Sequence, residues 1–65
     1  MKDEISLSKR ESECALLLLK GLTAKEIASQ LQLSYRTIED YIKIMKYKFR
    51  ARNKSDLIVK LIENK

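Results

Sequence analysis

A helix-start signature that occurs twice constrains this 65-residue chain more than any other feature. Residues 8–11 (Ser-Lys-Arg-Glu) and 23–26 (Thr-Ala-Lys-Glu) are both capping boxes, in which a hydroxyl and a glutamate three residues later satisfy each other's backbone amides. Gly21, the only glycine, lies between them, where the first helix is expected to end. The chain lacks proline, and one this short buries only about 60% of its unfolded surface. We therefore predict a simple, all-α domain.

Apolar spacing places four helices in this domain. The first is expected at about residues 9–20 and the second at about 24–31. Ser34 is an N-cap candidate for a third helix at about 35–49, which carries an apolar stripe formed by Ile38, Ile42, Met45 and Phe49. A fourth helix at about 54–63 follows Asn53. Residues 1–6 have no periodic pattern, so we predict an arm or linker there and a compact domain over 7–65.

Composition excludes several classes of function. The chain has no histidine, a single cysteine and no glycine-rich loop, so we expect no enzyme activity, no metal and no cofactor. Cys14 lies on the apolar face of the first helix and is expected to be a buried, inert thiol. The longest apolar run, residues 14–19, is too short to cross a bilayer, and the first residues do not resemble a signal peptide. We therefore expect a cytoplasmic protein.

The net charge of +5 is confined to one segment. Residues 34–54 contain seven basic and two acidic side chains, whereas the rest of the chain has seven of each. This segregation favours a surface that binds a polyanion over an ordinary solvated helix face.

A short helix, a tight turn and a longer helix with a basic outer face form a helix-turn-helix pattern, which binds duplex DNA by inserting its second helix into the major groove. On a helical wheel, the face opposite the apolar stripe exposes Arg36, Glu39, Asp40, Lys43 and Tyr47. Lys46 and Arg50 flank this face.

Four stretches together carry a more specific resemblance: residues 7–13, 21–28, 33–39 and 48–57. In order and without gaps, they resemble the DNA-binding domain of LuxR/GerE-type bacterial transcription regulators. The resemblance implies a four-helix domain whose third helix enters the major groove, whose fourth helix forms a dimer contact and whose target is often an inverted repeat. It also implies a receiver or ligand-sensing domain on the N-terminal side if the chain is part of a longer regulator.

The chain departs from that family at the groove face. Glu39 replaces a commonly basic residue and Asp40 a commonly small or apolar one, while Arg50 stands where a glycine commonly ends the third helix. A carboxylate can accept a hydrogen bond from cytosine N4, so Glu39 is a candidate for reading cytosine. Alternatively, Glu39 only pairs with Lys43, four residues further along the helix.

The predicted contacts fall into three groups. Base contacts are expected from Arg36, Glu39, Asp40 and Lys43. Contacts to the DNA backbone are expected from Lys25, Ser34, Thr37, Lys46, Tyr47, Lys48 and Arg50. A weak two-fold homodimer is expected through the fourth helix, with Val59 and Ile62 in the contact.

The preferred function is sequence-specific binding of double-stranded DNA as a transcription regulator. Two alternatives stay open: the promoter-reading domain of a sigma factor, and a protein-interaction module that keeps the fold but has lost DNA binding. Glu39 and Asp40 are the strongest sequence argument for the interaction module, because acids on the groove face repel phosphates.

Overall fold

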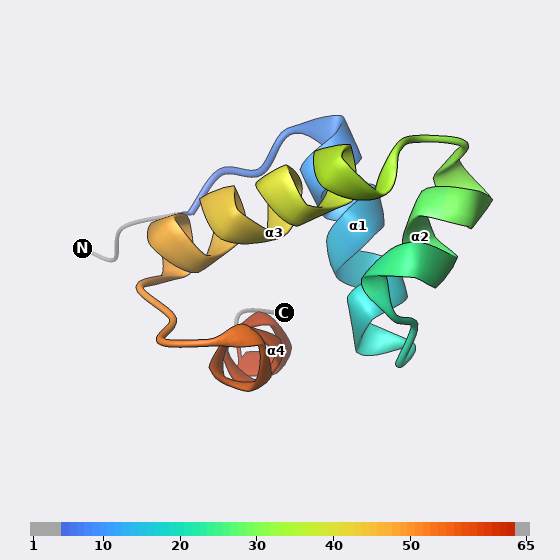
Figure 1. Ribbon diagram of the computed structural model, residues 1–65. Helices are drawn as coiled ribbons and strands as arrows, with labels where there is room; N and C mark the ends of the chain where they lie inside the picture. Colours follow the sequence, from blue (N-terminus) through green and yellow to red (C-terminus); the bar gives the residue numbers. More distant parts are fainter. Residues whose placement is uncertain (1–4, 64–65) are drawn as a thin grey trace.

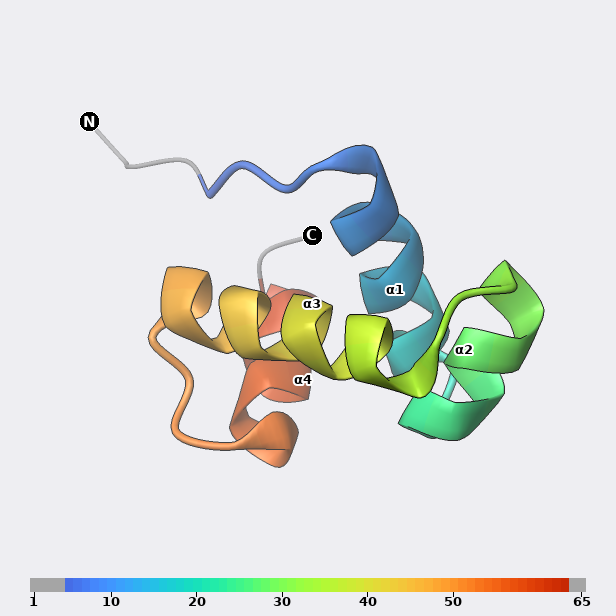
Figure 2. The same cartoon turned by 45° about the horizontal axis from the view of Figure 1, so that its top comes forward.

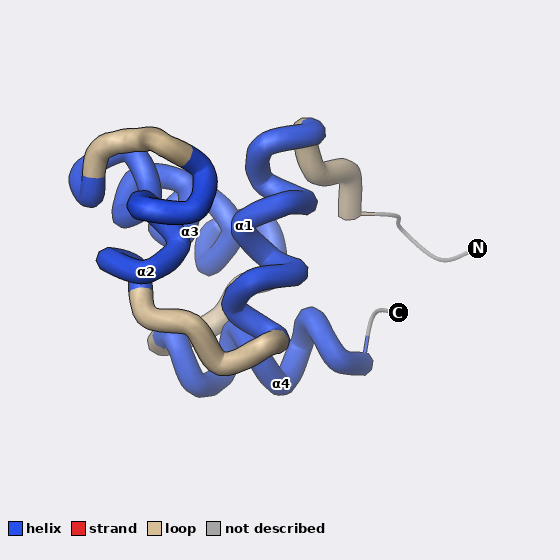
Figure 3. Tube along the Cα trace, turned by 90° about the vertical axis from the view of Figure 1, so that its right-hand side faces the viewer, coloured by secondary structure: helices blue, strands red, loops and turns tan. Residues whose placement is uncertain are grey.

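The computed structural model describes residues 5–63, and all regular secondary structure in that range is helical (Figure 3). Its four helices are α1 (Lys9–Leu19), α2 (Ala24–Leu31), α3 (Tyr35–Phe49) and α4 (Lys54–Glu63). The predicted fold class is confirmed, and the predicted bounds differ only at the end of α1. Within residues 5–63, no helix combines the length and the hydrophobicity needed to cross a bilayer.

The helix starts are those that the sequence predicts. The Ser8 amide donates to Glu11 Oε1 at 3.0 Å and the Glu11 amide donates to Ser8 Oγ at 3.2 Å, which is a complete capping box. Thr23 and Glu26 form the second box, with distances of 2.8 and 3.2 Å. In α4, Asn53 Oδ1 accepts from the Asp56 amide at 2.8 Å. Each cap satisfies amides that the first turn of a helix leaves free.

Three helices end in one common motif, in which a residue one or two positions beyond the helix adopts a left-handed conformation. In α1 this residue follows Lys20 and is Gly21, with φ of 93°. In α2 and α3 it is Gln32 and Arg50, with φ of 57° and 56°. Arg50 stands where the family resemblance leads us to expect a glycine at the end of the third helix. The helix ends at Phe49, and Arg50 itself adopts the left-handed conformation.

The helices enclose one core. Figure 1 shows α3 as a long helix with α1 and α2 gathered around its N-terminal half and α4 below it. The predicted α3 stripe is buried throughout, and it meets Cys14 and Leu18 of α1, Ile27 of α2 and Leu57 and Leu61 of α4. Burial raises the pKa of the Cys14 thiol to about 11, as expected for an inert core cysteine.

The segment before α1 lies alongside the C-terminal half of α3 (Figures 1 and 2). Ile5 and Leu7 are half-buried against the core, although Ile5 belongs to the predicted arm, which has no periodic pattern. Residues 1–4 of the predicted arm lie outside the described residues.

Candidate nucleic-acid interface

The rotation of α3 is fixed by its cap and its buried stripe. Ser34 caps the helix: its Oγ accepts from the Thr37 amide at 3.1 Å and lies 2.8 Å from the Thr37 hydroxyl. Ile38 and Met45 are completely buried, and Ile42 and Phe49 nearly so. The opposite face of α3 must therefore point to solvent.

That solvent face carries the residues that the sequence selected for base contacts. Arg36, Glu39, Asp40 and Lys43 are all exposed. Tyr47 continues the same face and is 85% exposed, an unusual position for a large aromatic ring that nothing in the described residues covers. α3 thus presents a continuous polar face, about 22 Å long at 1.5 Å per residue, to solvent.

Charge is graded along this face. Around the middle of α3, the two acidic residues share one shallow hollow with three lysines. Its lining residues are Ala24, Tyr35, Glu39, Asp40, Ile42, Lys43, Lys46 and Lys54. A second hollow, at the C-terminal end, has no acid among its lining residues, which are Lys43, Lys46, Tyr47, Lys48, Arg50, Ala51 and Arg52. The most positive part of the surface is therefore the end of α3 and the loop that follows it.

Glu39 has a neighbour that the sequence analysis did not select. The nearby carboxylate of Glu39 raises the pKa of the Tyr35 phenol, one turn earlier on α3. The ion pair that the spacing of Glu39 and Lys43 favours is not formed; the ion pairs found within residues 5–63 involve other residues. Because Glu39 forms no ion pair with Lys43, its carboxylate is available to accept a hydrogen bond at the centre of the exposed face.

The remaining predicted backbone contacts lie in two places. Lys25 is exposed in the first turn of α2, beside the start of that helix, where free amides attract phosphate. Lys46 is half-buried and Arg50 is exposed at the other end of the surface. Ser34 and Thr37 bond to each other as part of the α3 cap, so their local role is clear, and their contact with phosphate stays a prediction.

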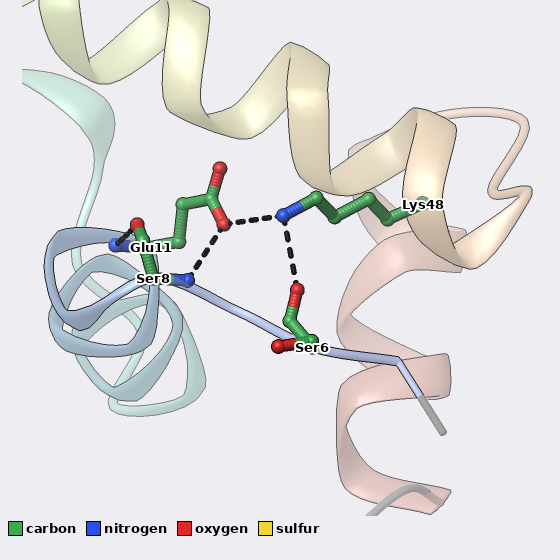
Figure 4. A network of polar contacts seen from close by, with 4 residues as sticks. All are labelled: Ser6, Ser8, Glu11 and Lys48. Atoms are coloured by element: carbon green, nitrogen blue, oxygen red, sulfur yellow. Dashed lines mark hydrogen bonds and ion pairs between the residues drawn. The ribbon is translucent and has the colours of Figure 1, made fainter.

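Lys48 differs from the other basic residues because its ammonium group has partners within the chain. It donates to Glu11 Oε1 at 2.8 Å and to the carbonyl oxygen of Ser6 at 3.0 Å (Figure 4). Glu11 is only 5% exposed, and the bond from Lys48 is the largest cause of its lowered pKa, followed by the bond from the Ser8 amide. The sequence placed Lys48 among the phosphate contacts; the structure gives its ammonium group a different set of partners.

Helix α4 has one buried and one exposed apolar face. Leu57 and Leu61 are buried, whereas Val59 and Ile62 are 50% and 56% exposed. The two exposed residues are three positions apart and so lie on one side of the helix. Leu16 of α1 is a further exposed apolar residue, at 59%.

Comparison with known proteins agrees with this geometry. A family model described as "GerE: Bacterial regulatory proteins, luxR family" matches residues 5–61. The chain belongs to the luxR family. It is 38% identical over 56 residues to the spore germination protein GerE of Bacillus subtilis (strain 168), which corresponds to 86% of this chain and 76% of GerE. It is also 33% identical over 61 residues to the probable transcriptional regulator ycf29 of Cyanophora paradoxa.

Among solved structures, the crystal structure of the phage VqmA–DPO complex contains a similar luxR-type domain. The two share 40% sequence identity with a TM-score of 0.91, over 97% of this chain and 29% of that one. The chain likewise spans 29% of ycf29, so it corresponds to under a third of both of these longer proteins. Membership in the luxR family and similarity to transcription regulators support the prediction of a DNA-binding domain that regulates transcription.

Proposed function

We propose that this chain binds double-stranded DNA sequence-specifically, with α3 in the major groove, as the DNA-binding domain of a transcription regulator. The observation that carries the proposal is the exposed face of α3. It lies opposite a buried apolar stripe, and the segment that contains it holds the whole net charge of +5. A helix with one fixed polar face fits the major groove, which is about 12 Å wide.

In the proposed complex, Arg36, Glu39, Asp40 and Lys43 face base edges. Lys46, Tyr47 and Arg50 follow the phosphates at one end of the helix, where the lining of the hollow is basic. At the other end, Lys25, Ser34 and Thr37 lie at helix starts, whose amides favour phosphate oxygens. The function needs no catalytic group, and we place the protein in the cytoplasm, where bacterial duplex DNA is accessible.

We further propose that two copies bind together through α4. The exposed Val59 and Ile62 provide an apolar contact that is too small for a stable dimer in free solution but sufficient once DNA holds both copies. A two-fold contact of this kind matches an inverted repeat with half-sites about one helical turn apart.

Selection of bound sequences from random duplex DNA tests the proposal. A shared motif that is lost in the Lys43→Ala variant would support groove reading by α3. Binding of duplex DNA without enrichment of any motif would contradict sequence specificity.

The second candidate is a protein-interaction module on the same fold. The observation that favours it is the exposure of Glu39 and Asp40 in the middle of α3, where they oppose phosphate binding. Failure of the chain to bind any duplex at low salt would favour this module over the proposed function.

A further inference from the structure

The Glu11–Lys48 contact joins two distant parts of the chain. The two residues are 37 positions apart, and their side chains meet beside the start of α1 at the C-terminal part of α3 (Figure 4). Three oxygen–nitrogen contacts converge there: Glu11 accepts from Lys48 and from the Ser8 amide, and Lys48 also donates to Ser6. A buried carboxylate with such partners is expected to keep them, because leaving it unpaired in the protein interior costs free energy.

The same segment continues onto the end of the molecule that holds α4. Ile5 lines a small hollow together with Phe49 of α3 and with Lys60 and Glu63 of α4. Residues 5–8 therefore bond to α1 through Ser8 and to α3 through Ser6, and Ile5 borders the same hollow as the last turn of α4. We call residues 5–8, with Glu11 and Lys48, the N-terminal clasp.

We propose that the N-terminal clasp sets the angle at which α3 is presented to DNA, and that Lys48 is a positioning residue rather than a phosphate contact. The inference rests on the proposed function. It follows from the leverage of a helix about 22 Å long, in which a tilt of roughly 5° about the start moves the far end by about 2 Å. Such a shift is comparable to the length of a hydrogen bond, so contacts from Lys46, Tyr47 and Arg50 depend on what holds that end.

The rival role for Lys48 makes an opposite prediction. If Lys48 leaves Glu11 to neutralise a phosphate in the complex, it must contribute to the salt dependence of binding, at about 0.9 per contact in the log–log slope. Removing the Glu11 charge would then free Lys48 and strengthen binding. If the clasp positions α3, removing the Glu11 charge weakens binding and leaves the slope unchanged.

The test measures duplex affinity as a function of salt for Glu11→Gln, Lys48→Met and the double variant, at a temperature where circular dichroism shows each protein fully folded. Glu13→Gln is the matched control for the lost charge, since Glu13 is on the same helix but pairs with Arg10 at the surface. Lys46→Met is the control for a lost phosphate contact.

The clasp predicts that Glu11→Gln and Lys48→Met each weaken binding about tenfold, a size typical of coupled sites. Their slopes should match the wild-type slope, and the double variant should bind no more weakly than either single variant, because both remove one interaction. Lys48→Arg, which keeps the positive charge, should bind with an affinity within about threefold of the wild type. Glu13→Gln should not weaken binding, and Lys46→Met should lower the slope by about 0.9.

Two results would overturn the clasp while leaving the proposed function intact. One is a Glu11→Gln affinity equal to that of Glu13→Gln; the other is a Lys48→Met slope lowered as in Lys46→Met. If the variants at the ion pair do not fold, Ile5→Ser loosens the clasp without touching that pair, and wild-type affinity in this variant would equally overturn it. A wild-type chain that binds no duplex overturns the proposed function together with the clasp.

Discussion

Gln32 and Arg50 end the two helices of the helix-turn-helix in the same left-handed conformation, with φ values of 57° and 56°. Neither residue is suited to it, since an L side chain costs roughly 1 kcal/mol or more there, whereas glycine does not. Both helix ends are still hydrogen-bonded. The Leu33 amide donates to the Ala28 carbonyl at 2.9 Å, and the Ala51 amide donates to the Lys46 carbonyl at 2.8 Å.

Replacing either residue by glycine should therefore stabilise the domain. We expect Gln32→Gly and Arg50→Gly each to raise the free energy of unfolding by about 0.5–1 kcal/mol, measured by urea denaturation. Only Arg50→Gly should weaken DNA binding, because it alone removes a positive charge from the basic surface. Equal losses of affinity in the two variants would contradict a phosphate contact by Arg50.

Binding to duplex DNA should weaken steeply with salt. If about five to seven basic side chains of each protomer reach phosphates, the log–log slope of affinity against salt should be roughly −4 to −6 per protomer. Fluorescence anisotropy with a labelled duplex at several salt concentrations measures it. A flat response would contradict the phosphate contacts assigned to the basic surface.

Glu39→Ala separates recognition of cytosine from a purely local role. If Glu39 accepts from cytosine N4, the variant should lose about 1–3 kcal/mol of preference at one base pair of the selected site. If Glu39 only interacts with its neighbours on α3, every sequence should bind more tightly, because a negative charge near phosphate has gone. Lys43→Ala should weaken the preferred site in either case and serves as the control.

A charge on the outer face of α4 should abolish cooperative binding without unfolding the domain. We expect Val59→Glu and Ile62→Glu to bind a single half-site as the wild type does, but to lose cooperativity on a full inverted repeat. Quantitative gel-shift titration of both duplexes measures this. Unchanged cooperativity in both variants would move the dimer contact elsewhere, for which Leu16 and Leu19 of α1 are the next candidates.

The stability of the domain should fall in acid partly through Glu11. The pKa of Glu11 is lowered in the folded state. Its contribution to the free energy of unfolding is therefore complete at pH values above the unfolded pKa of about 4.3, and it is lost as the pH falls through the folded pKa. Glu11→Gln should therefore lower the free energy of unfolding by about 1–3 kcal/mol at pH 7 and by much less at pH 2. Urea titrations at the two pH values measure the difference; a constant difference would contradict the ion pair with Lys48.

Most of the fold could be predicted because its determinants are local. Each capping box joins residues only three positions apart, Ser8 with Glu11 and Thr23 with Glu26. The starts of α1 and α2 can therefore be predicted from the local sequence. The exposure of Lys43 and Tyr47 follows equally from the four-residue spacing of a helix once the buried stripe is known.

The role of Lys48 could not be predicted from spacing. Its partner Glu11 is 37 residues away, and the sequence gives Glu11 a complete explanation as a capping residue, so nothing indicates that a second bond reaches the same carboxylate. The packing of Ile5 was missed for a related reason: an extended segment that covers a helix end needs no periodic pattern. The signal that could have raised the question is the apolar side chain of Ile5, which follows three charged residues.

The confinement of the entire +5 charge to residues 34–54 makes the domain an electric dipole. Its positive pole lies along α3, and the rest of the chain is neutral on balance. In the electric field of a DNA duplex, such a domain is oriented before contact, so that a larger fraction of encounters begins with α3 facing the DNA. Added salt should then act first on how fast the complex forms, and less on how long it lasts.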